Sequence, residues 1–200
     1  MSQQSTADQV RLDEIVKTAA LVIHRQGYDA TSMNDIADAV KLTKAGLYYY
    51  TKGKQDLLYK IILWAMDLVE TEILQPGRAI KDPEQRLHEI VQRHLGAILV
   101  DGGVVAILTV EVDKLTPEHK DEIKGRHRLY LDLVRDTLLE LKEQGRLRPQ
   151  DPMIAALNLF ATILGIARWY QPGGHLSREV VIEEITSYVL GALLKDDKRQ

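Results

Sequence analysis

Apolar residues recur along this chain every three or four positions, and no alternating apolar–polar pattern persists. This spacing is typical of helices with one buried face, whereas a half-buried strand alternates at every second residue. The first such face carries Leu12, Ile15 and Ala19, and the pattern breaks at Gly27. We therefore predict an all-α fold of about nine helices.

Residues 31–58 predict two short helices separated by a tight turn. Ser32 can cap the first helix. Asp35, three residues later, can accept a bond from the backbone N–H of Ser32 in a variant of the capping box. Thr43 can cap the second helix, over residues 44–50. Two helices joined in this way form a helix-turn-helix, whose second helix fits the DNA major groove.

The later helices are bounded by proline and glycine. A fourth helix is expected over residues 54–75, with Pro76-Gly77 as its stop. A capping residue followed by proline starts a helix at each of Asp82-Pro83, Thr116-Pro117 and Asp151-Pro152. We predict helices from residue 83 to the break at 101–103, over 104–113, 117–145 and 152–170, and from the Ser177 cap to about 194.

We predict two functional domains. Residues 1–53 form a helix-turn-helix DNA-binding domain of three helices, and residues 54–200 form a helical domain for ligand binding and dimerisation. The helix over residues 54–75 belongs to both and can transmit motion between them.

Charge is distributed unevenly along the chain. Five lysines against Asp56 alone give residues 41–60 a net charge of +4, whereas the whole chain of 200 residues carries −3. Such a local excess is expected of a face that binds phosphates. The chain has no cysteine, which fits a reducing cytoplasm, and its longest apolar run, 153–167, is too short to span a membrane. We expect no membrane partner.

No arrangement of residues predicts an enzyme or a cofactor. The few serines lie in the N-terminal segment, at expected caps or on the last helix, no glycine-rich phosphate loop appears, and the six histidines lack metal-ligand spacing. We expect no bound metal. A metal site from His94, Glu111 and His127, brought together across helices, would define a metal-responsive alternative.

The segment at 31–58 resembles the DNA-binding region of TetR-family (TetR/AcrR) transcriptional regulators. The resemblance is carried by Thr31-Ser32, Asp35-Ile36-Ala37, Thr43-Lys44, Leu47-Tyr48-Tyr49-Tyr50, Lys52-Gly53-Lys54 and Asp56-Leu57-Leu58. It implies a bacterial cytoplasmic protein, associated with the nucleoid when it is bound to DNA.

Three positions depart from the usual family pattern. Lys41 stands where glycine is common, so a positive φ there would strain the backbone by about 1 kcal/mol. Gly46 replaces a hydroxyl residue, which removes one polar contact. Thr51 replaces a frequent phenylalanine, which weakens an apolar plug at the start of the next helix.

We expect the double-stranded operator DNA to be contacted by the second helix and its flanks. Lys44, Tyr48 and Tyr49 offer a charge, two rings and two hydroxyls to bases and phosphates. Thr31 and Lys54 should hold phosphates at the edges. The predicted DNA contacts are Thr31, Ser32, Thr43, Lys44, Ala45, Gly46, Tyr48, Tyr49 and Lys54.

The helix predicted over 152–170 is apolar on nearly every side and must be buried on nearly every side. One face can pack on the domain core and the other on a second subunit, with the last helix beside it. A monomeric bundle with this helix at its centre is the alternative. The predicted homodimer contacts are Leu157, Ala161, Leu164, Ile185, Tyr188 and Val189.

Several polar residues interrupt the apolar faces of the later helices. They either bond to each other and to the backbone, or line a cavity and orient a ligand. The candidate ligand contacts are His94, Ile98, His127, Tyr130, Asn158, Thr162 and Trp169.

The run from Arg168 to Ser177, with Trp-Tyr-Gln-Pro-Gly-Gly in order, is similar to one in TetR-family regulators of fatty-acid, phenylacetate and steroid catabolism. That resemblance implies a repressor released by a small hydrophobic effector, with an acyl-CoA as the leading candidate. In the structural interpretation of the same run, Pro-Gly-Gly ends a helix and Trp169 packs against it. The alternative function is a helical lipid- or acyl-binding protein that has lost DNA binding.

Overall fold

The computed structural model describes residues 6–100 and 111–195, and it confirms the all-α class. Short 3-10 turns at η2 (Val112–Lys114) and η3 (Ile166–Arg168) and a π-helical turn at η1 (Glu70–Leu74) adjoin the helices. The α-helices are α1 (Thr6–Gln26), α2 (Met33–Ala39), α3 (Lys44–Tyr50), α4 (Lys54–Val69), α5 (Gln75–Ala79), α6 (Pro83–Val100), α8 (Pro117–Glu143), α9 (Pro152–Gly165) and α10 (Arg178–Leu193).

The chain divides into two compact units. The N-terminal unit comprises Met1–Asp67 with Gly103–Ile123, and the C-terminal unit comprises Leu68–Gly102 with Lys124–Gln200. Because α4 and α8 both cross this division, each helix contributes residues to both units. The functional boundary between residues 53 and 54 stays a prediction.

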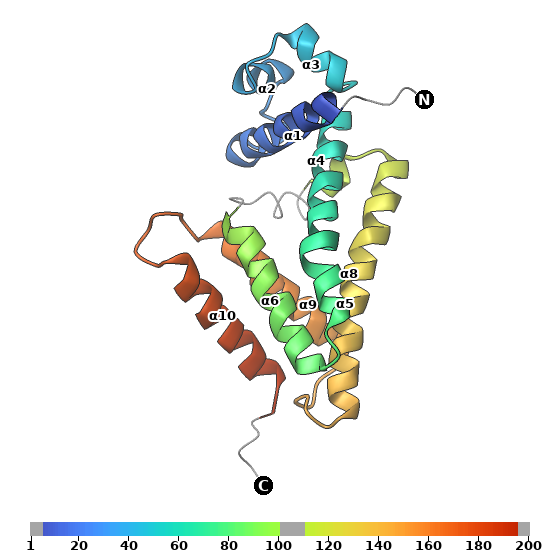
Figure 1. The fold of residues 1–200 in the computed structure, drawn as a ribbon, viewed down its shortest axis with the longest axis vertical. Coiled ribbons are helices and arrows are strands. Elements are labelled where there is room, and N and C mark those ends of the chain that lie inside the picture. The colour runs from blue at the N-terminus through green and yellow to red at the C-terminus, as the bar shows by residue number, and fades with distance from the viewer. Residues whose placement is uncertain (1–5, 101–110, 196–200) are drawn as a thin grey trace. The chain divides into compact units, whose positions relative to one another are not determined.

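In the N-terminal unit, α1 packs against α2, and α2 packs against α3 (Figure 1). Ile15, Ile36 and Leu47, one from each helix, are fully buried, so the predicted apolar faces do meet in one core. As predicted, α1 ends at Gly27, whose φ of +84° is accessible to glycine without strain.

The fourth helix continues beyond its predicted stop. After α4, η1 joins directly to α5, and helical structure ends at Ala79 rather than at Pro76-Gly77. Pro76 lies in the first turn of α5, where a proline ring is tolerated, and a π-helical turn precedes it. Gly77 is buried against α6, and a Cβ there would lie 3.0 Å from Ile90 Cγ1. Close packing against α6, rather than a helix stop, explains the glycine at this position.

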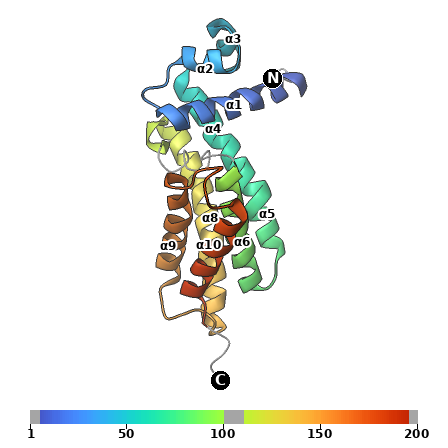
Figure 2. The same ribbon diagram turned by 90° about the vertical axis from the view of Figure 1, so that its left-hand side faces the viewer.

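The C-terminal unit is a bundle in which α6 packs against both α9 and α10, and α10 packs against α9 (Figure 2). The predicted caps are present: Asp151 and Ser177 accept backbone N–H bonds at the starts of α9 and α10, and Asp82 accepts one from Gln85. The helix predicted over 104–113 falls mostly outside the described residues.

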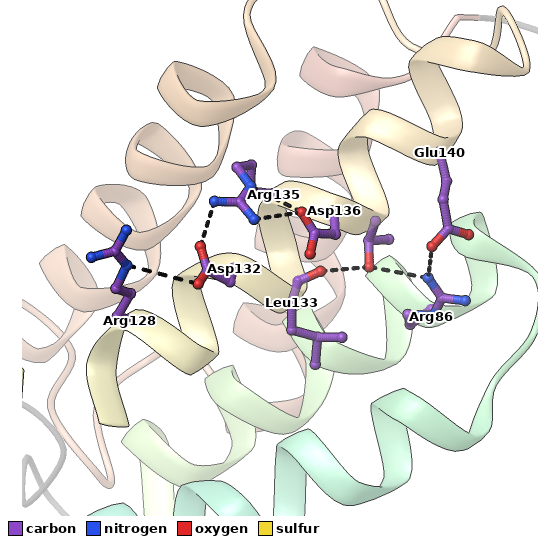
Figure 3. A network of polar contacts seen from close by, with 8 residues as sticks. Arg86, Arg128, Asp132, Leu133, Arg135, Asp136 and Glu140 are labelled. Atoms are coloured by element: carbon purple, nitrogen blue, oxygen red, sulfur yellow. Dashed lines mark hydrogen bonds and ion pairs between the residues drawn. The ribbon is translucent and has the colours of Figure 1, made fainter. Parts of the chain in front are cut away.

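An ion-pair network joins α6 to α8 in the C-terminal unit (Figure 3). The Arg86 guanidinium donates to Glu140 at 2.7 Å and to the Thr137 hydroxyl at 3.4 Å. Nearer the start of α8, Arg135 donates to Asp132 and Asp136. Across residues 6–100 and 111–195, none of the helices has the length and hydropathy needed to cross a bilayer.

Candidate nucleic-acid interface and effector site

The helix-turn-helix starts as predicted, with a complete capping box on α2. The Ser32 hydroxyl accepts a bond from the Asp35 N–H at 3.2 Å, and the Asp35 carboxylate accepts one from the Ser32 N–H at 2.7 Å. Bonds from Ser32 lower the pKa of Asp35. A carboxylate in the first turn of a helix is also favoured by the helix dipole.

The turn between α2 and α3 confirms the expectation for Lys41. Its φ is +58°, the left-handed conformation that a glycine would adopt more readily. The Arg11 guanidinium of α1 donates to the Val40 carbonyl at 2.8 Å, which ties the turn to the first helix. The bond fixes the backbone just before the turn that leads into α3.

Helix α3 presents a mixed aromatic and basic face. Thr43 caps it by accepting the Gly46 N–H at 3.1 Å, and Leu47 is fully buried beneath it. Lys44 and Ala45 are exposed, as are Tyr48 and Tyr49, at 45% and 71%. Both phenol rings are therefore accessible to a partner, and their contact with DNA stays a prediction.

Thr31 does not lie where the prediction placed it. Its side chain is buried, and its hydroxyl donates to the Gly27 carbonyl at 2.8 Å. Because that proton is already used within the chain, Thr31 shapes the loop before α2 and does not offer a donor to phosphate. Ser32 and Thr43 remain exposed at the starts of their helices.

Lys54 stands at the start of α4 beside the loop that follows α1. Its Nζ lies 4.3 Å from the centre of the Tyr28 ring and donates to the Asp29 carbonyl at 3.3 Å. Lys114 forms an ion pair with Asp29 at 2.6 Å, and that bond lowers the pKa of the carboxyl. Lys54 is therefore oriented by the protein before any phosphate is bound.

A polar network between α3 and α4 was missed from the sequence. The buried Thr51 hydroxyl donates to Asp56 at 2.8 Å, and Lys60 pairs with the same carboxylate oxygen at 2.8 Å. The Lys52 N–H donates to it at 2.9 Å. Burial raises the pKa of Asp56, but these bonds outweigh burial and leave it lowered. Thr51 thus replaces an apolar plug with hydrogen bonds.

Two of the predicted ligand contacts meet inside the C-terminal unit. His94 on α6 and Tyr130 on α8 are buried, and the Tyr130 hydroxyl lies 2.8 Å from His94 Nδ1. The Phe160 ring of α9 packs against both, with ring centres 5.9 Å from His94 and 4.8 Å from Tyr130. Ile98, one turn beyond His94, is buried as well.

The other predicted ligand contacts lie elsewhere. Asn158 is exposed on α9, and the Thr162 hydroxyl is used locally, donating to the Asn158 carbonyl at 2.9 Å. Trp169 is 51% exposed, so it is not the buried end of α9. His127 is half-buried, and burial lowers its pKa. Contact of these residues with a ligand stays a prediction.

The residues predicted for the dimer face differ in their exposure. Leu157 and Tyr188 are exposed, at 51% and 67%, and Ala161 is exposed too, whereas Leu164 and Ile185 are half-buried. Val189 is buried within its own unit, so it packs on the core and leaves the set of candidate contacts. Two further apolar residues on these helices are exposed and were not predicted: Ile154 on α9 and Val180 on α10.

The metal alternative needed His94, Glu111 and His127 to converge. In the part of the chain that the structure describes, no three histidine or carboxylate side chains are placed to hold a metal ion, and these three are not such a group.

Comparison with known proteins agrees with this geometry. Residues 15–61 match the family described as "Bacterial regulatory proteins, tetR family", and residues 81–193 match "Tetracyclin repressor-like, C-terminal domain". The HTH-type transcriptional repressor KstR2 of Mycolicibacterium smegmatis is 27% identical over 186 residues, covering 92% of this chain and 90% of the relative. The fatty acid metabolism regulator protein of Bacillus subtilis is 22% identical over 155 residues, covering 75% and 78%.

Solved structures extend the likeness to the fold. AibR, crystallised in complex with isovaleryl coenzyme A and operator DNA, is 32% identical with a TM-score of 0.82, over 89% of this chain and 97% of that one. KstR2 of Mycobacterium tuberculosis has a TM-score of 0.85 at 24% identity, over 97% and 98%, which shows the fold alone. These relatives are regulators and not enzymes. Matched across both of its regions, the chain belongs to the TetR family of transcriptional regulators.

Proposed function

We propose that this protein is a homodimeric repressor that binds a palindromic or pseudopalindromic operator and leaves it when a small hydrophobic effector binds. An acyl-CoA is the leading candidate for the effector. The observation that carries this proposal is the exposed face of α3, where Lys44, Tyr48 and Tyr49 stand beside a recognition-helix cap. Such a regulator acts in the bacterial cytoplasm, at the nucleoid while bound to DNA.

The chemistry of the α3 face suits a major groove. Lys44 supplies a phosphate or guanine contact, and Gly46 allows the backbone to come close to the bases. The two exposed tyrosine rings can pack on thymine methyl groups while their hydroxyls bond to phosphates. With Lys54 held by Tyr28, the basic segment 41–60 provides attraction to DNA of any sequence.

Homodimerisation supplies a second helix-turn-helix, which can bind the second half-site of the operator. A single helix-turn-helix buries little DNA, whereas a dimer reads two half-sites about 34 Å apart. The exposed apolar residues Ile154 and Leu157 on α9 and Tyr188 on α10 form a face that favours a protein partner. A second copy of the chain is the proposed partner, through four helices, two from each subunit.

The choice of an acyl-CoA as the candidate effector is supported by the likeness to AibR, which was crystallised with isovaleryl coenzyme A and operator DNA. Release would be a population shift: the effector prefers a conformation in which the two α3 helices no longer match successive grooves. An effector that binds that state about 100-fold better supplies roughly 2.7 kcal/mol. Because α4 and α8 contribute residues to both units, they are the proposed route of coupling.

Fluorescence anisotropy tests the proposal. The full-length protein is titrated against labelled DNA from upstream of its own gene, with a shuffled duplex as the control. Preformed complex is then titrated with isovaleryl-CoA and longer acyl-CoAs, with free coenzyme A as the matched ligand lacking the acyl group.

We expect specific binding, followed by release at micromolar acyl-CoA and not with coenzyme A alone. Failure to prefer the upstream DNA at any salt concentration would favour the lipid-binding alternative. Release by a metal ion, with none by any acyl-CoA, would contradict the hydrophobic effector.

A further inference from the structure

Among the described residues of the C-terminal unit, two buried side-chain atoms have no hydrogen-bond partner, Thr186 Oγ1 and His94 Nε2, and the histidine lies in a cluster of aromatic side chains. His94, Tyr130 and Phe160 come from α6, α8 and α9 and form a compact aromatic cluster. His94 is only 3% exposed, and its Nδ1 is engaged by the Tyr130 hydroxyl at 2.8 Å. Its other ring nitrogen, Nε2, is buried and lacks a hydrogen-bond partner among the described residues.

Burial keeps both polar members of the cluster uncharged near neutral pH. It lowers the pKa of His94 from 6.5 to about 4, and it raises the pKa of Tyr130 above its usual value of 10. At pH 7 the site therefore consists of a neutral imidazole and a neutral phenol. A neutral imidazole carries its proton on one nitrogen only.

The bond to Tyr130 decides which nitrogen is protonated. If Nδ1 carried the proton and donated it, the phenol proton and the Nε2 lone pair would both be left without partners in the cluster. If the phenol donates to Nδ1, the proton lies on Nε2 and a single N–H remains unused. Since unmade hydrogen bonds of buried groups are unfavourable, the second arrangement is preferred.

We infer that the Nε2–H of His94 donates a hydrogen bond to a carbonyl oxygen of the effector, so the site selects a neutral carbonyl compound such as a thioester or a ketone. The inference rests on the proposed function, because it assigns one bond to the effector proposed there. The neutral imidazole supplies one donor and no charge. An ionised carboxylate would lose its hydration without gaining a cation in return. A free acid is accordingly a poor ligand for this position.

Phe160 and Tyr130 restrict where that carbonyl can lie. Their rings meet edge to face at an interplanar angle of 78°, with centres 4.8 Å apart, and Ile98 is buried one turn further along α6. Mostly apolar surroundings with one placed donor are the usual composition of a small-molecule site. The acyl part of the ligand would pack on the aromatic rings while its carbonyl reaches His94.

Calorimetry with matched ligands tests this assignment. The full-length protein is titrated with isovaleryl-CoA, with the thioether analogue in which CH₂ replaces the carbonyl, and with free isovalerate. We expect the thioester to bind about tenfold more tightly than the thioether, equal to about 1.4 kcal/mol. Isovalerate should bind more weakly still.

Variants assign the preference to His94. The double variant His94→Phe with Tyr130→Phe removes both hydrogen-bonding partners and keeps the aromatic volume, so its fold should be retained, as thermal unfolding can verify. It should bind the thioester and the thioether equally. Tyr130→Phe alone should retain part of the preference, because Nε2 can still donate.

Each outcome separates the inference from the proposed function. Equal binding of thioester and thioether by the unaltered protein overturns the His94 assignment and leaves an acyl-CoA effector standing. An undiminished thioester preference in the double variant does the same, because the carbonyl contact then lies elsewhere. Binding of neither CoA compound overturns both the inference and the acyl-CoA proposal.

Nitrogen NMR of the protein without ligand provides a separate readout. Long-range ¹H–¹⁵N spectra of ¹⁵N-histidine protein distinguish the two neutral tautomers, and His94→Phe identifies the resonance. We expect His94 with a protonated Nε2 and an unprotonated Nδ1 at pH 7. A protonated Nδ1 overturns the inference regardless of the ligand data.

Discussion

Lys41 and Gly145 hold the same position in two helix endings of the same type. Each is the second residue after the end of its helix, with φ of +58° and +72°, and in both endings the following N–H donates to the carbonyl five residues earlier at 2.9 Å. A second hydrogen bond runs from the N–H of Lys41 to the Asp38 carbonyl and from that of Gly145 to the Lys142 carbonyl. A helix end with these two bonds is the Schellman motif, in which glycine is favoured because it has no Cβ. Lys41 therefore adopts a conformation that Gly145 adopts without strain.

Lys41→Gly should raise the free energy of unfolding by about 1 kcal/mol, because it removes the Cβ from a left-handed residue. Urea unfolding followed by circular dichroism measures this. Lys41→Ala is the matched control, since it removes the same charge and keeps the Cβ. Gly145→Ala should shift stability in the opposite direction. Equal stability of Lys41→Gly and Lys41→Ala would mean that the backbone there is relaxed.

Lys44→Ala should weaken binding to all duplexes and reduce the salt dependence of the binding constant. Loss of one phosphate contact in each subunit of the proposed dimer reduces the magnitude of the slope of log K against log salt by about 1.8, at about 0.9 per contact. Anisotropy titrations over a range of salt concentrations give that slope. Lys142→Ala, an exposed lysine in the last turn of α8, is the control and should leave it unchanged. An identical slope for both variants would remove Lys44 from the phosphate contacts.

Leu157→Glu and Tyr188→Glu should each split the proposed dimer. Both side chains are more than half exposed in the single chain, so a charge should be tolerated by the fold and not by an apolar interface, where an unpaired charge costs several kcal/mol. Sedimentation velocity reports the change in mass. Leu139→Glu on α8, 43% exposed, is the control. Intact dimers in both test variants would place the interface elsewhere.

Acid should destabilise the protein partly through His94. Burial lowers its folded-state pKa from 6.5 to about 4, so between these values the unfolded chain binds more protons and the stability falls as the pH falls. The contribution present above pH 6.5 is lost by about pH 4 and amounts to about 3 kcal/mol. Urea midpoints at pH 7, 5.5 and 4.5 measure it.

Carboxylates such as Asp56 and Asp82 also have lowered pKa values, so their protonation in acid lowers the stability of the folded protein as well. The double variant His94→Phe with Tyr130→Phe retains them and serves as the reference. It should show a shallower loss between pH 6.5 and 4.5. An identical profile would mean that His94 accepts its proton without cost in the folded state.

Thr51→Val should lower the free energy of unfolding by about 1 to 2 kcal/mol, because it leaves the shape unchanged and removes a buried donor to Asp56. Thr71→Val, on an exposed surface of the π-helical turn, is the control and should change little. Chemical unfolding of the two variants side by side makes the comparison. Equal effects would mean that the hydroxyl of Thr51 adds nothing to the junction of α3 and α4.

The sequence by itself determined those features that depend on residues a few positions apart. The caps at Ser32, Thr43 and Ser177 were predicted and are present, because each hydroxyl accepts a bond from an N–H three residues later. The strained turn at Lys41 was also predicted, since a family resemblance marked the position as one for glycine. Helical periodicity was sufficient for the fold class for the same reason: it reports on the local conformation.

Only the tertiary structure decided which residues that are far apart in the chain come into contact. The bond between Tyr130 and His94 joins residues 36 positions apart, and periodicity gave no sign of which polar residues would be paired and which exposed. Thr31 was expected on the surface and is buried, and Val189 was expected at a partner and faces its own core. Pro76 lies within helical structure because a π-helical turn precedes it and Gly77 packs closely on α6. In each case the outcome depends on which helix faces packed together, and a pattern within one helix does not contain that choice.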